Sequence, residues 1–289
     1  MLHHNLRLPR RGRQTEAGTL DLSLAHATKL KAISEAKVKT NKIDSDVLAM
    51  LLYADLIPEA HMIRPEMRGP RDLMRTRLRL VQKCASCKNS IERLLEKFNL
   101  HDVTELDELY RLQAACHEAQ IELLQDQIKT LEAALHPYLI PNADIQRLLW
   151  IPGIGKVNAF TLYTEIDGIE RFPSARQFFS YCRLVPGAAN SGGRTRHRSG
   201  SKQGNRYLKL AFGHAGVRAM QYYPEIRAFY RAKRRKKPER IARTLVALEI
   251  ARIVYHVLSK HEDFNGLFKG APLSRTKQSR WPRLASPAA

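Results

Sequence analysis

Apolar residues recur every three or four positions between Arg71 and Leu135, in a stretch of the chain that is largely free of Gly and Pro. This spacing places apolar side chains on one face of an α-helix. The pattern is interrupted at residues 99–104, so we predict two long helices that form an antiparallel coiled-coil hairpin. The apolar positions of its inner face are Val81, Cys84, Ile91, Leu94 and Phe98, then Leu109, Leu112, Cys116, Ala119, Leu123, Ile128, Leu131 and Leu135.

Shorter helical patterns follow Pro137 and Pro141, which close the hairpin. The expected helices cover residues 144–150, 156–165, 175–182, 205–220 and 239–260. Before the hairpin, Leu20, Leu22 and Leu24 alternate with polar or small residues and indicate a short strand. Thr40 can cap a helix that begins near Asn41. The fold class predicted from these patterns is mainly α.

A tight turn between two of the predicted helices contains two glycines, in the sequence Ile151-Pro152-Gly153-Ile154-Gly155. The pattern resembles a helix-hairpin-helix motif. In such a turn, backbone N–H groups at a helix N-terminus can point at a DNA phosphate, independently of base sequence. We therefore name Gly153, Gly155 and Lys156 as candidate DNA contacts. The alternative is an ordinary corner between two helices.

Positive charge is the strongest feature of the composition. The chain has 49 Lys and Arg against 28 Asp and Glu, a formal net charge of +21. The excess is concentrated between Arg176 and Lys260, where 20 Lys or Arg face three Glu. Residues 231–237 are almost continuously basic, which predicts a surface that tracks the phosphates of a nucleic-acid backbone. A polyanionic partner, nucleic acid above all, is the simplest explanation.

Other composition features exclude several classes of protein. No apolar run approaches the roughly 20 residues that a membrane-spanning helix needs, and the first residues lack the apolar core of a signal peptide. We therefore expect a cytoplasmic protein without a membrane partner. Its four cysteines are too few and too scattered for a disulfide framework. Cys84 and Cys87 lie in a helical pattern without further zinc ligands, which favours a buried helix face.

A glycine-rich loop with two serines carries the candidate chemistry. Ser199 and Ser201 lie among Arg194, Arg196, Arg198, Lys202 and Arg206. Glycines allow a backbone to approach a phosphodiester closely, and arginines can hold its oxygens in paired hydrogen bonds. A serine hydroxyl in that setting is either a hydrogen-bond donor or a nucleophile. The five basic residues are our candidate DNA contacts in this loop.

Three segments, in this order along the chain, resemble a known family. They are residues 24–33 with Lys39-Thr40-Asn41-Lys42-Ile43-Asp44, then residues 151–155, then Gly200-Ser201-Lys202-Gln203-Gly204-Asn205-Arg206-Tyr207-Leu208. The combination looks like the DEDD transposases of bacterial insertion sequences, the "IS one-ten" family, with its Piv-type DNA invertase relatives. The match runs from about Leu20 to Leu258.

The resemblance implies a recombinase with two sites. An N-terminal domain similar to RNase H-like, RuvC-like resolvases would hold Mg²⁺ with four acidic residues. A C-terminal domain would supply a serine that attacks a DNA phosphate, at Ser201, with Ser199 as the fallback. The implied partners are DNA at insertion-sequence ends and targets, and a guide RNA encoded by the element. Apart from the resemblance, the coiled-coil hairpin itself indicates an arm that joins a homo-oligomer; the alternatives are an arm that spans DNA and a hairpin that packs on its own domain.

The chain departs from this family at the acidic site. The first two acidic positions of the family would precede this chain, and the third is Asn41, so only Asp44 remains as a candidate metal ligand and catalytic acid. One carboxylate and an amide make a poor Mg²⁺ site. We therefore expect an N-terminally truncated transposase that binds DNA but is catalytically impaired. The alternative is a non-enzymatic DNA- or RNA-binding regulator derived from a transposase.

These expectations divide the chain into five parts. Residues 1–19 are a disordered basic N-terminus, and residues 20–68 are a partial RNase H-like α/β domain. Residues 69–137 form the coiled-coil hairpin. Residues 138–261 form an α-helical C-terminal transposase domain with the helix-hairpin-helix-like motif and the serine loop, and residues 262–289 are a disordered basic tail.

Overall fold

The computed structural model describes residues 24–26, 30, 40–58, 60–139, 142–185, 188–191, 194–197 and 204–274. The chain divides into two units, Met1–Ile63 and Arg64–Ala289. Most of the described residues lie in helices, which confirms the prediction of a mainly α protein. None of the described helices combines the length and the apolar composition that crossing a membrane requires.

The described part of the first unit contains one helix, α2 (Asn41–Tyr53). Thr40 caps it as predicted, because the Thr40 hydroxyl accepts a hydrogen bond from the N–H of Ile43 at 3.3 Å. Extended backbone around Leu24 and His26 exchanges two hydrogen bonds with Pro58 and Ala60. Residues 20–23 of the expected strand lie outside the described residues, so the RNase H-like sheet stays a prediction.

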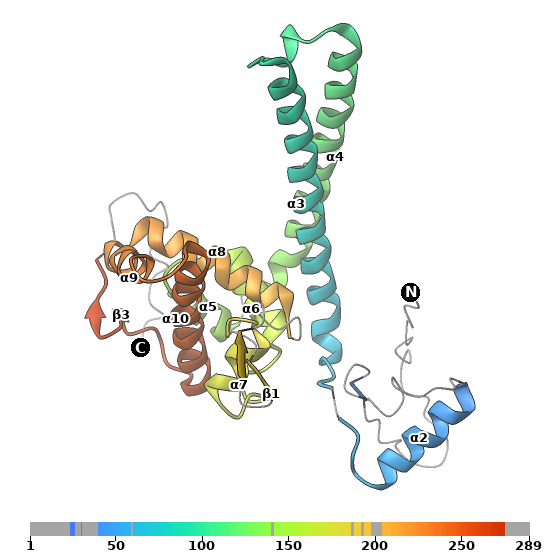
Figure 1. The fold of residues 1–289 in the computed structure, drawn as a ribbon, viewed down its shortest axis with the longest axis vertical. Coiled ribbons are helices and arrows are strands. Elements are labelled where there is room, and N and C mark those ends of the chain that lie inside the picture. The colour runs from blue at the N-terminus through green and yellow to red at the C-terminus, as the bar shows by residue number, and fades with distance from the viewer. Residues whose placement is uncertain are drawn as a thin grey trace. The chain divides into compact units, whose positions relative to one another are not determined.

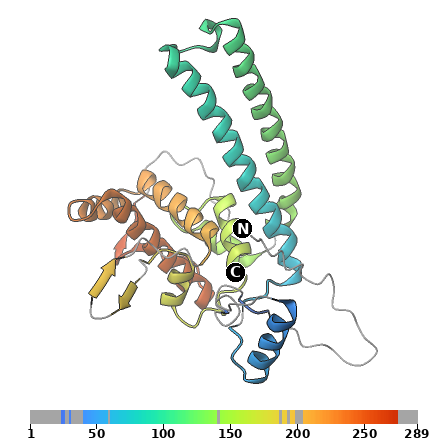
Figure 2. The same ribbon diagram turned by 45° about the vertical axis from the view of Figure 1, so that its right-hand side comes forward.

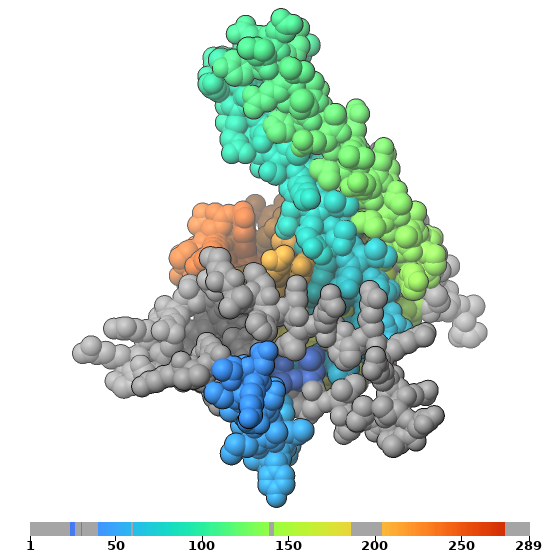
Figure 3. Space-filling model, turned by 90° about the vertical axis from the view of Figure 1, so that its right-hand side faces the viewer, coloured from blue at the N-terminus to red at the C-terminus, as the bar shows by residue number. Residues whose placement is uncertain are grey.

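The second unit opens with two long helices, α3 (Pro65–Phe98) and α4 (Glu108–Leu139), which lie side by side (Figure 1, Figure 3). Asn99 ends α3 in the left-handed conformation, and the short 3-10 helix η2 (Val103–Glu105) leads into α4. Asp102 caps η2 by accepting a hydrogen bond from the N–H of Thr104 at 2.9 Å. The predicted pair of antiparallel helices is thus present, with its break at the expected place.

The face that α4 turns toward α3 differs from the predicted one. Leu109, Leu112 and Leu123 are 79%, 64% and 60% exposed, and Cys116 and Ala119 are exposed too. A second set of positions, also spaced by three and four residues, is buried or half-buried instead. This set is Tyr110, Ala114, His117, Ile121, Leu124, Ile128, Leu131 and Leu135. The first five predicted positions of α4 were therefore wrong, and they form an exposed second stripe.

Six helices among the described residues build the rest of the second unit around an apolar core. They are α5 (Ala143–Leu149), α6 (Lys156–Ile166), α7 (Ala175–Tyr181), α8 (Arg206–Tyr222), α9 (Pro224–Arg234) and α10 (Glu239–Lys260). Helix α8 is central, since it packs against α6, α9 and α10. Phe178 and Phe212 are fully buried and meet edge to face, with ring centroids 6.0 Å apart.

Polar residues start three of these helices. Asn142, Ser174 and Asn205 each accept hydrogen bonds from backbone N–H groups in the first turn of α5, α7 and α8. Helix α9 was not predicted as a helix: residues 231–234 of the basic run form its last turn. Its inner face buries Ile226, while the basic residues stay at the surface.

Two short hairpins complete the described chain. Strands β1 (Ala188–Ser191) and β2 (Arg194–His197) pair antiparallel, with Ala188 opposite His197, in part of the predicted glycine-rich loop (Figure 2). Strands β3 (Leu267–Phe268) and β4 (Ala271–Pro272) form the second. The expected disordered tail is therefore wrong for residues 262–274, because Phe268 is buried against Phe229. Residues 275–289 lie outside the described residues.

Candidate serine segment and nucleic-acid interface

The candidate residues of the glycine-rich loop are only partly described. Ser199, Ser201, Arg198 and Lys202 lie outside the described residues. Arg194 and Arg196 are described in their backbone alone, as alternate residues of β2. Description of the chain resumes at Gly204, where the serine segment enters α8. The anchoring of this C-terminal end can be followed atom by atom.

Gly204 occupies a position that only glycine fits. Its φ is +101°, and a Cβ there would lie 2.5 Å from the carbonyl oxygen of Tyr181. The close approach allows the N–H of the next residue, Asn205, to donate to that same oxygen at 2.6 Å. The guanidinium Nε of Arg183 donates to the carbonyl oxygen of Gly204 at 2.8 Å. Gly204 is thus tied to the end of α7 on both sides.

Asn205 uses both ends of its side-chain amide. The amide oxygen accepts hydrogen bonds from the N–H groups of Tyr207 and Leu208, at 2.8 and 3.2 Å, and so caps α8. The amide nitrogen donates to Oε2 of Glu165 at 2.7 Å. Because Asn205 is buried, these bonds replace water and fix the orientation of the amide. The entry to α8 is therefore bonded to a residue near the end of α6.

Glu165 is 1% exposed and lies between two arginines of α3. Arg75 donates from Nε at 2.6 Å and from an Nη at 2.9 Å, each to a different carboxylate oxygen. Arg71 donates from Nε at 3.0 Å. The buried carboxylate thus accepts from three side chains on two other elements, which is the condition under which a charge is tolerated in a protein interior.

The ionised form of Glu165 is favoured by its neighbours. Burial by itself would raise the pKa of Glu165. The hydrogen bond from Arg75, the charge of Arg71 and the hydrogen bond from Asn205 outweigh burial and hold that pKa below its ordinary value. A carboxylate so engaged is a poor proton acceptor. Glu165 therefore acts as an anchor that joins α3, α6 and α8 and is not positioned as a general base.

A second buried acid continues this anchor at the end of α6. Asp167, 4% exposed, accepts from the N–H of Arg64 at 3.1 Å and from its Nε at 2.8 Å. Arg171 donates from Nε to the carbonyl oxygen of Ile166 at 2.7 Å. Cations at the C-terminus of a helix are favourable because the last carbonyl groups carry partial negative charge. The start of α3 is therefore fixed against the end of α6.

Arg206 and Tyr207, which follow Asn205 in the family-like motif, lie close to the Glu165 anchor. The Arg75 guanidinium lies 4.5 Å from the centre of the Tyr207 ring, and the Arg206 guanidinium lies 4.9 Å from it. Arg75 consequently contacts both Glu165 and Tyr207. The Arg206 side chain is exposed, so its charge stays available at the surface beside the entry to α8.

The glycines of the turn between α5 and α6 have different surroundings. Gly153 has φ +80°, and a Cβ there would overlap the carbonyl oxygen of Ala215 and lie 2.8 Å from the nitrogen of Ala219. Gly153 thus allows close packing on α8. Gly155, the N-cap of α6, has open space around its Cα, and Lys156 after it is exposed. Of the three candidate contacts, Gly155 and Lys156 are the accessible ones.

The two groups of predicted DNA contacts lie near opposite ends of α6. Lys156 begins this helix, whereas Glu165, which holds the entry to α8, lies one residue before its end. Nine residues of α-helix span about 14 Å along the axis. Helix α6 therefore separates the turn from the anchored end of the serine segment by about one and a half nanometres.

The described residues do not fit the implied Mg²⁺. Asn41 and Asp44 lie in the first turn of α2, where Asn41 is exposed and Asp44 is half-buried. Oδ1 of Asp44 is buried and accepts no hydrogen bond within the described part of the chain. No group of three His, Cys, Asp or Glu side chains that could hold a metal occurs among the described residues. A single carboxylate does not neutralise Mg²⁺ or supply its octahedral oxygen shell.

The anchor around Glu165 was missed by the sequence analysis, although the sequence contains one sign of it. Glu165 follows Leu162 by three residues and therefore lies on the same helix face, which the periodicity marks as buried. A carboxylate on a buried face needs cationic partners. Which arginines supply them is a tertiary matter, since Arg71 and Arg75 are 94 and 90 residues away.

Comparisons with known proteins place a transposase domain over the same region. Residues 145–231 match the profile of the transposase IS116/IS110/IS902 family. A probable family 20 transposase of Pseudomonas aeruginosa is 26% identical over 265 residues, which cover 82% of this chain and 78% of that protein. The matched region starts just inside α5 and ends in α9, so it contains the turn, the serine segment, Glu165 and Asn205, but not the two arginines of α3.

Two further relatives are transposases of named insertion sequences. The transposase for insertion sequence element IS1328 of Yersinia enterocolitica is 26% identical over 190 residues, covering 60% of this chain and 57% of the relative. The transposase for insertion sequence element IS1111A of Coxiella burnetii is 26% identical over 204 residues, covering 63% and 56%. The chain thus matches little more than half the length of these two relatives.

Proposed function

We propose that the chain binds insertion-sequence DNA and cleaves and rejoins its strands through Ser201, with an activity that the incomplete acidic site impairs, because residues 145–231 match the IS116/IS110/IS902 family of transposases. Ser199 is the alternative nucleophile. The observation that carries this proposal is the anchoring of the segment that follows the serines. Gly204 and Asn205 are built into the domain by the bonds to Tyr181 and Glu165. A nucleophile is effective only when its approach to the phosphate is fixed.

The proposed reaction exchanges one phosphorus–oxygen bond for another. The Ser201 oxygen forms a bond to the DNA phosphorus, the bond to one deoxyribose oxygen breaks, and that oxygen leaves as a hydroxyl after taking up a proton. The free hydroxyl of a strand later reverses the exchange and releases the serine. Since the number of phosphoester bonds is conserved, rejoining needs no external energy source.

The basic residues around the serines have a defined task in this proposal. Charge on the phosphate oxygens must be balanced during the transfer, and arginine does so with paired hydrogen bonds. Arg194, Arg196, Arg198, Lys202 and Arg206 are the residues to which we assign it. Arg206 is the one whose side chain is described, and it is exposed beside the anchored Asn205.

The exposed N-terminus of α6 is the proposed second contact with DNA. Gly155 leaves it without a side-chain cap, and open space surrounds the glycine Cα, so a phosphate can approach. Helix N-termini favour anions, and Lys156 adds charge. Gly153 supports this contact indirectly by packing on α8. Contacts of this kind hold the DNA backbone and do not read its sequence.

The test is a strand-cleavage assay with purified protein, DNA that carries insertion-sequence ends, the RNA of the element and Mg²⁺ in the buffer. Because the acidic site is incomplete, we expect a low yield of covalent protein–DNA adduct, which Ser201→Ala abolishes and Ser199→Ala leaves in place. An adduct lost only in Ser199→Ala would move the nucleophile to Ser199. DNA bound tightly without any adduct would contradict the enzymatic proposal and favour the alternative, a binding regulator.

The binding regulator has its own signature. Under this alternative, the arginine-rich loop only holds phosphates, so Ser201→Ala leaves DNA or RNA binding unchanged. Arg196→Ala and Arg198→Ala weaken binding and flatten its dependence on salt, because each phosphate contact releases counterions. A trapped serine adduct would rule the alternative out.

Self-association through the hairpin is the remaining part of the proposal. The exposed stripe of α4, defined by Leu109, Leu112, Cys116, Ala119 and Leu123, repeats by three and four residues. This repeat is the one that a partner helix in a coiled coil requires. Helix α4 has five acidic against two basic residues, in a strongly basic chain. Its surface therefore suits a protein partner better than nucleic acid, and we assign it to a second copy.

A further inference from the structure

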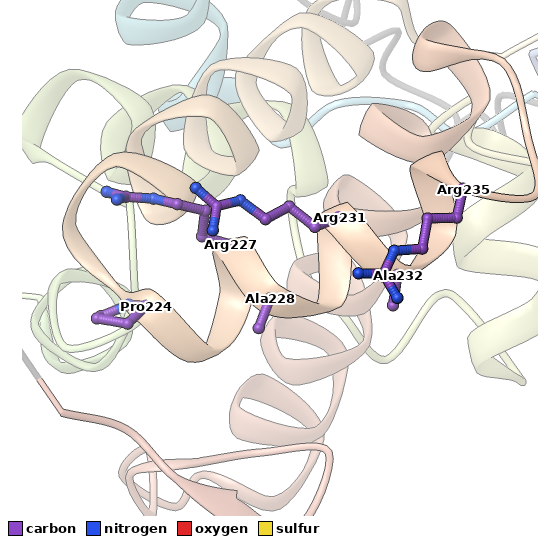
Figure 4. Close-up of a pocket in the computed structure, with 6 residues that line it drawn as sticks. All are labelled: Pro224, Arg227, Ala228, Arg231, Ala232 and Arg235. Carbon is purple, nitrogen blue, oxygen red and sulfur yellow. The ribbon is translucent and has the colours of Figure 1, made fainter.

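Helix α9 carries a groove to which the proposed reaction assigns no role. The groove is lined by residues of a single helix face and encloses about 300 Å³ (Figure 4). Its lining consists of Pro224, Arg227, Ala228, Arg231, Ala232 and Arg235. Every polar side chain in this set is an arginine. Ala228 and Ala232, between the arginines, have short side chains, so a ligand can approach the helix backbone closely.

The three arginines form a regular row. Arg227, Arg231 and Arg235 follow one another at intervals of four residues, which repeats a position on a helix about every 6 Å. Figure 4 shows their side chains extending along one face toward the N-terminal end of α9. The ligand that matches such a row is a chain of anionic groups at regular spacing. A lone small anion would use one or two of these guanidinium groups and leave the row unexplained.

Two of the three arginines are not neutralised. Arg231 and Arg235 are exposed, and neither side chain has a hydrogen bond or ion pair with another residue of the described chain. The acids closest to them in sequence are otherwise engaged. Glu225 accepts hydrogen bonds from Ser274, and Glu239 pairs with Arg234 at 3.5 Å and Arg243 at 2.5 Å. The charges of Arg231 and Arg235 are therefore free for an external anion.

The third arginine gives the row a fixed end. Arg227 donates from Nε to the carbonyl oxygen of Met220 at 2.9 Å and from Nη2 to that of Gln221 at 2.6 Å. It thereby caps α8 and is only half-exposed. Beyond the other end of the row, Lys236 and Lys237 continue the positive charge at the surface. Exposed positive charge therefore continues along the chain beyond the row as far as Lys237.

We propose that this arginine row on α9 binds the phosphate backbone of duplex DNA. The absence of aromatic residues from the lining argues for a duplex, because proteins hold unstacked single strands by stacking bases on aromatic rings. Arginines in a row along one helix face instead contact the phosphates that a duplex displays, without reading bases. The choice of DNA rests on the proposed function, whereas the site itself rests on the geometry of α9.

The experiment measures binding alone, so it does not depend on cleavage. The affinity of the full chain for a fluorescent DNA duplex is measured over a range of salt concentrations, for the wild type and for Arg231→Gln/Arg235→Gln. Arg227 is left intact because it holds α8. The matched control is Lys83→Gln/Lys88→Gln, which removes the same charge from two exposed positions of α3. A Ser201→Ala background keeps any reaction out of the measurement.

We expect the α9 variant to bind duplex DNA at least about tenfold more weakly and to lower the salt slope by about 2, roughly 0.9 for each lost phosphate contact. In the control variant, the loss of affinity and the change in salt slope should each be less than half as large as in the α9 variant. Arg231→Lys/Arg235→Lys should keep most of the slope, since charge is retained. Equal losses in the α9 variant and the control would overturn the proposal, as would weakened binding of single-stranded or duplex RNA with duplex DNA unaffected.

Failure of this inference is distinguishable from failure of the proposed function. If the wild type forms no serine adduct but the α9 variant loses duplex binding, the DNA site on α9 is supported and Ser201 is contradicted as the nucleophile. The α9 substitutions are also made in the chain with an intact Ser201. If that variant still forms the adduct and binds DNA with unchanged affinity and salt slope, the DNA site on α9 is contradicted and Ser201 is supported as the nucleophile.

Discussion

At the scale of single residues, Glu165 decides how the serine segment is attached. Its carboxylate is buried, and it is charged because Arg71, Arg75 and Asn205 donate to it. Removing one partner of a buried ion pair costs more than the pair itself contributes, since it leaves the other charge unpaired in a poor solvent. Arg75 would be the residue left unpaired, because it is hydrogen-bonded to both oxygens of Glu165.

Glu165→Gln is therefore expected to lower the free energy of unfolding by about 3 kcal/mol, while Gln keeps the size of the side chain. Chemical denaturation of the full chain measures this change. The control is Glu132→Gln, which breaks the pair of Arg77 with a carboxylate that is 46% exposed. For such a surface pair we expect a loss below about 1 kcal/mol. Similar losses in the two variants would contradict the role given to Glu165.

The same residue predicts a dependence on pH. Because the pKa of Glu165 is lower in the folded chain than its ordinary value of 4.5, its stabilising effect is complete above that value. The effect is lost as the pH falls from 4.5 through the lower pKa of the folded state. The difference in unfolding free energy between wild type and Glu165→Gln should therefore shrink on acidification below about pH 4.5. A constant difference over that range would show that folding leaves the pKa of Glu165 unchanged and would contradict the stabilising role of its charge.

At the scale of elements, the turn between α5 and α6 combines a packing position with an accessible one. Gly153 faces the backbone of α8, where no side chain fits. Gly155 caps α6 and has open space around its Cα. The sequence shows two glycines in a turn, but only their surroundings separate the one that the fold needs from the one that a ligand can reach.

Gly153→Ala should be strongly destabilising, by about 3 kcal/mol or more, because a Cβ would overlap Ala215 and the φ of +80° disfavours alanine. Gly155→Ala, at an unstrained backbone position, should change stability by less than about 1 kcal/mol. Thermal unfolding compares the two variants. If Gly155 lies at a DNA contact, its substitution should instead weaken DNA binding in a chain that remains folded. A stable Gly153→Ala variant would refute the packing of the turn on α8.

Helix α4 shows what periodicity can and cannot decide. Two apolar sets with three-and-four spacing interleave on this helix, and the predicted stripe joined parts of both. The five-residue step from Leu123 to Ile128 in the predicted stripe marks the place where it changed sets. Either set alone would have been consistent with a helix, so the existence and length of α4 were predictable. The choice of inner face depended on the contacts with α3.

At the scale of the whole molecule, positive charge is concentrated in the C-terminal helices and the acidic surface of the hairpin lies on α4. Between residues 176 and 260 the net charge is +17, whereas α4 has three more acidic than basic residues. Like charges repel over distances comparable to the Debye length, about 8 Å at physiological salt. We therefore expect the two regions to have different partners, DNA for the first and a second protein chain for the second.

Leu112→Glu/Leu123→Glu tests the partner of α4. If the exposed stripe joins two copies, two buried carboxylates without partners should weaken self-association by about tenfold or more, which analytical ultracentrifugation measures. Gln113→Glu/Gln120→Glu, which adds the same charge at exposed positions beside the stripe, is the matched control. The proposal fails if the leucine variant and the control sediment alike.

Periodicity, caps and charge determined from the sequence alone that the protein is mainly helical, where most helices begin and end, and that its C-terminal part is strongly basic. These properties depend on neighbours within a few turns, which the sequence displays directly. The tertiary structure alone decided which stripe of α4 is buried, that Gly153 packs on α8, and that Glu165 binds arginines some 90 residues away in sequence. Each of these depends on contacts between distant segments, whose partners no local pattern specifies.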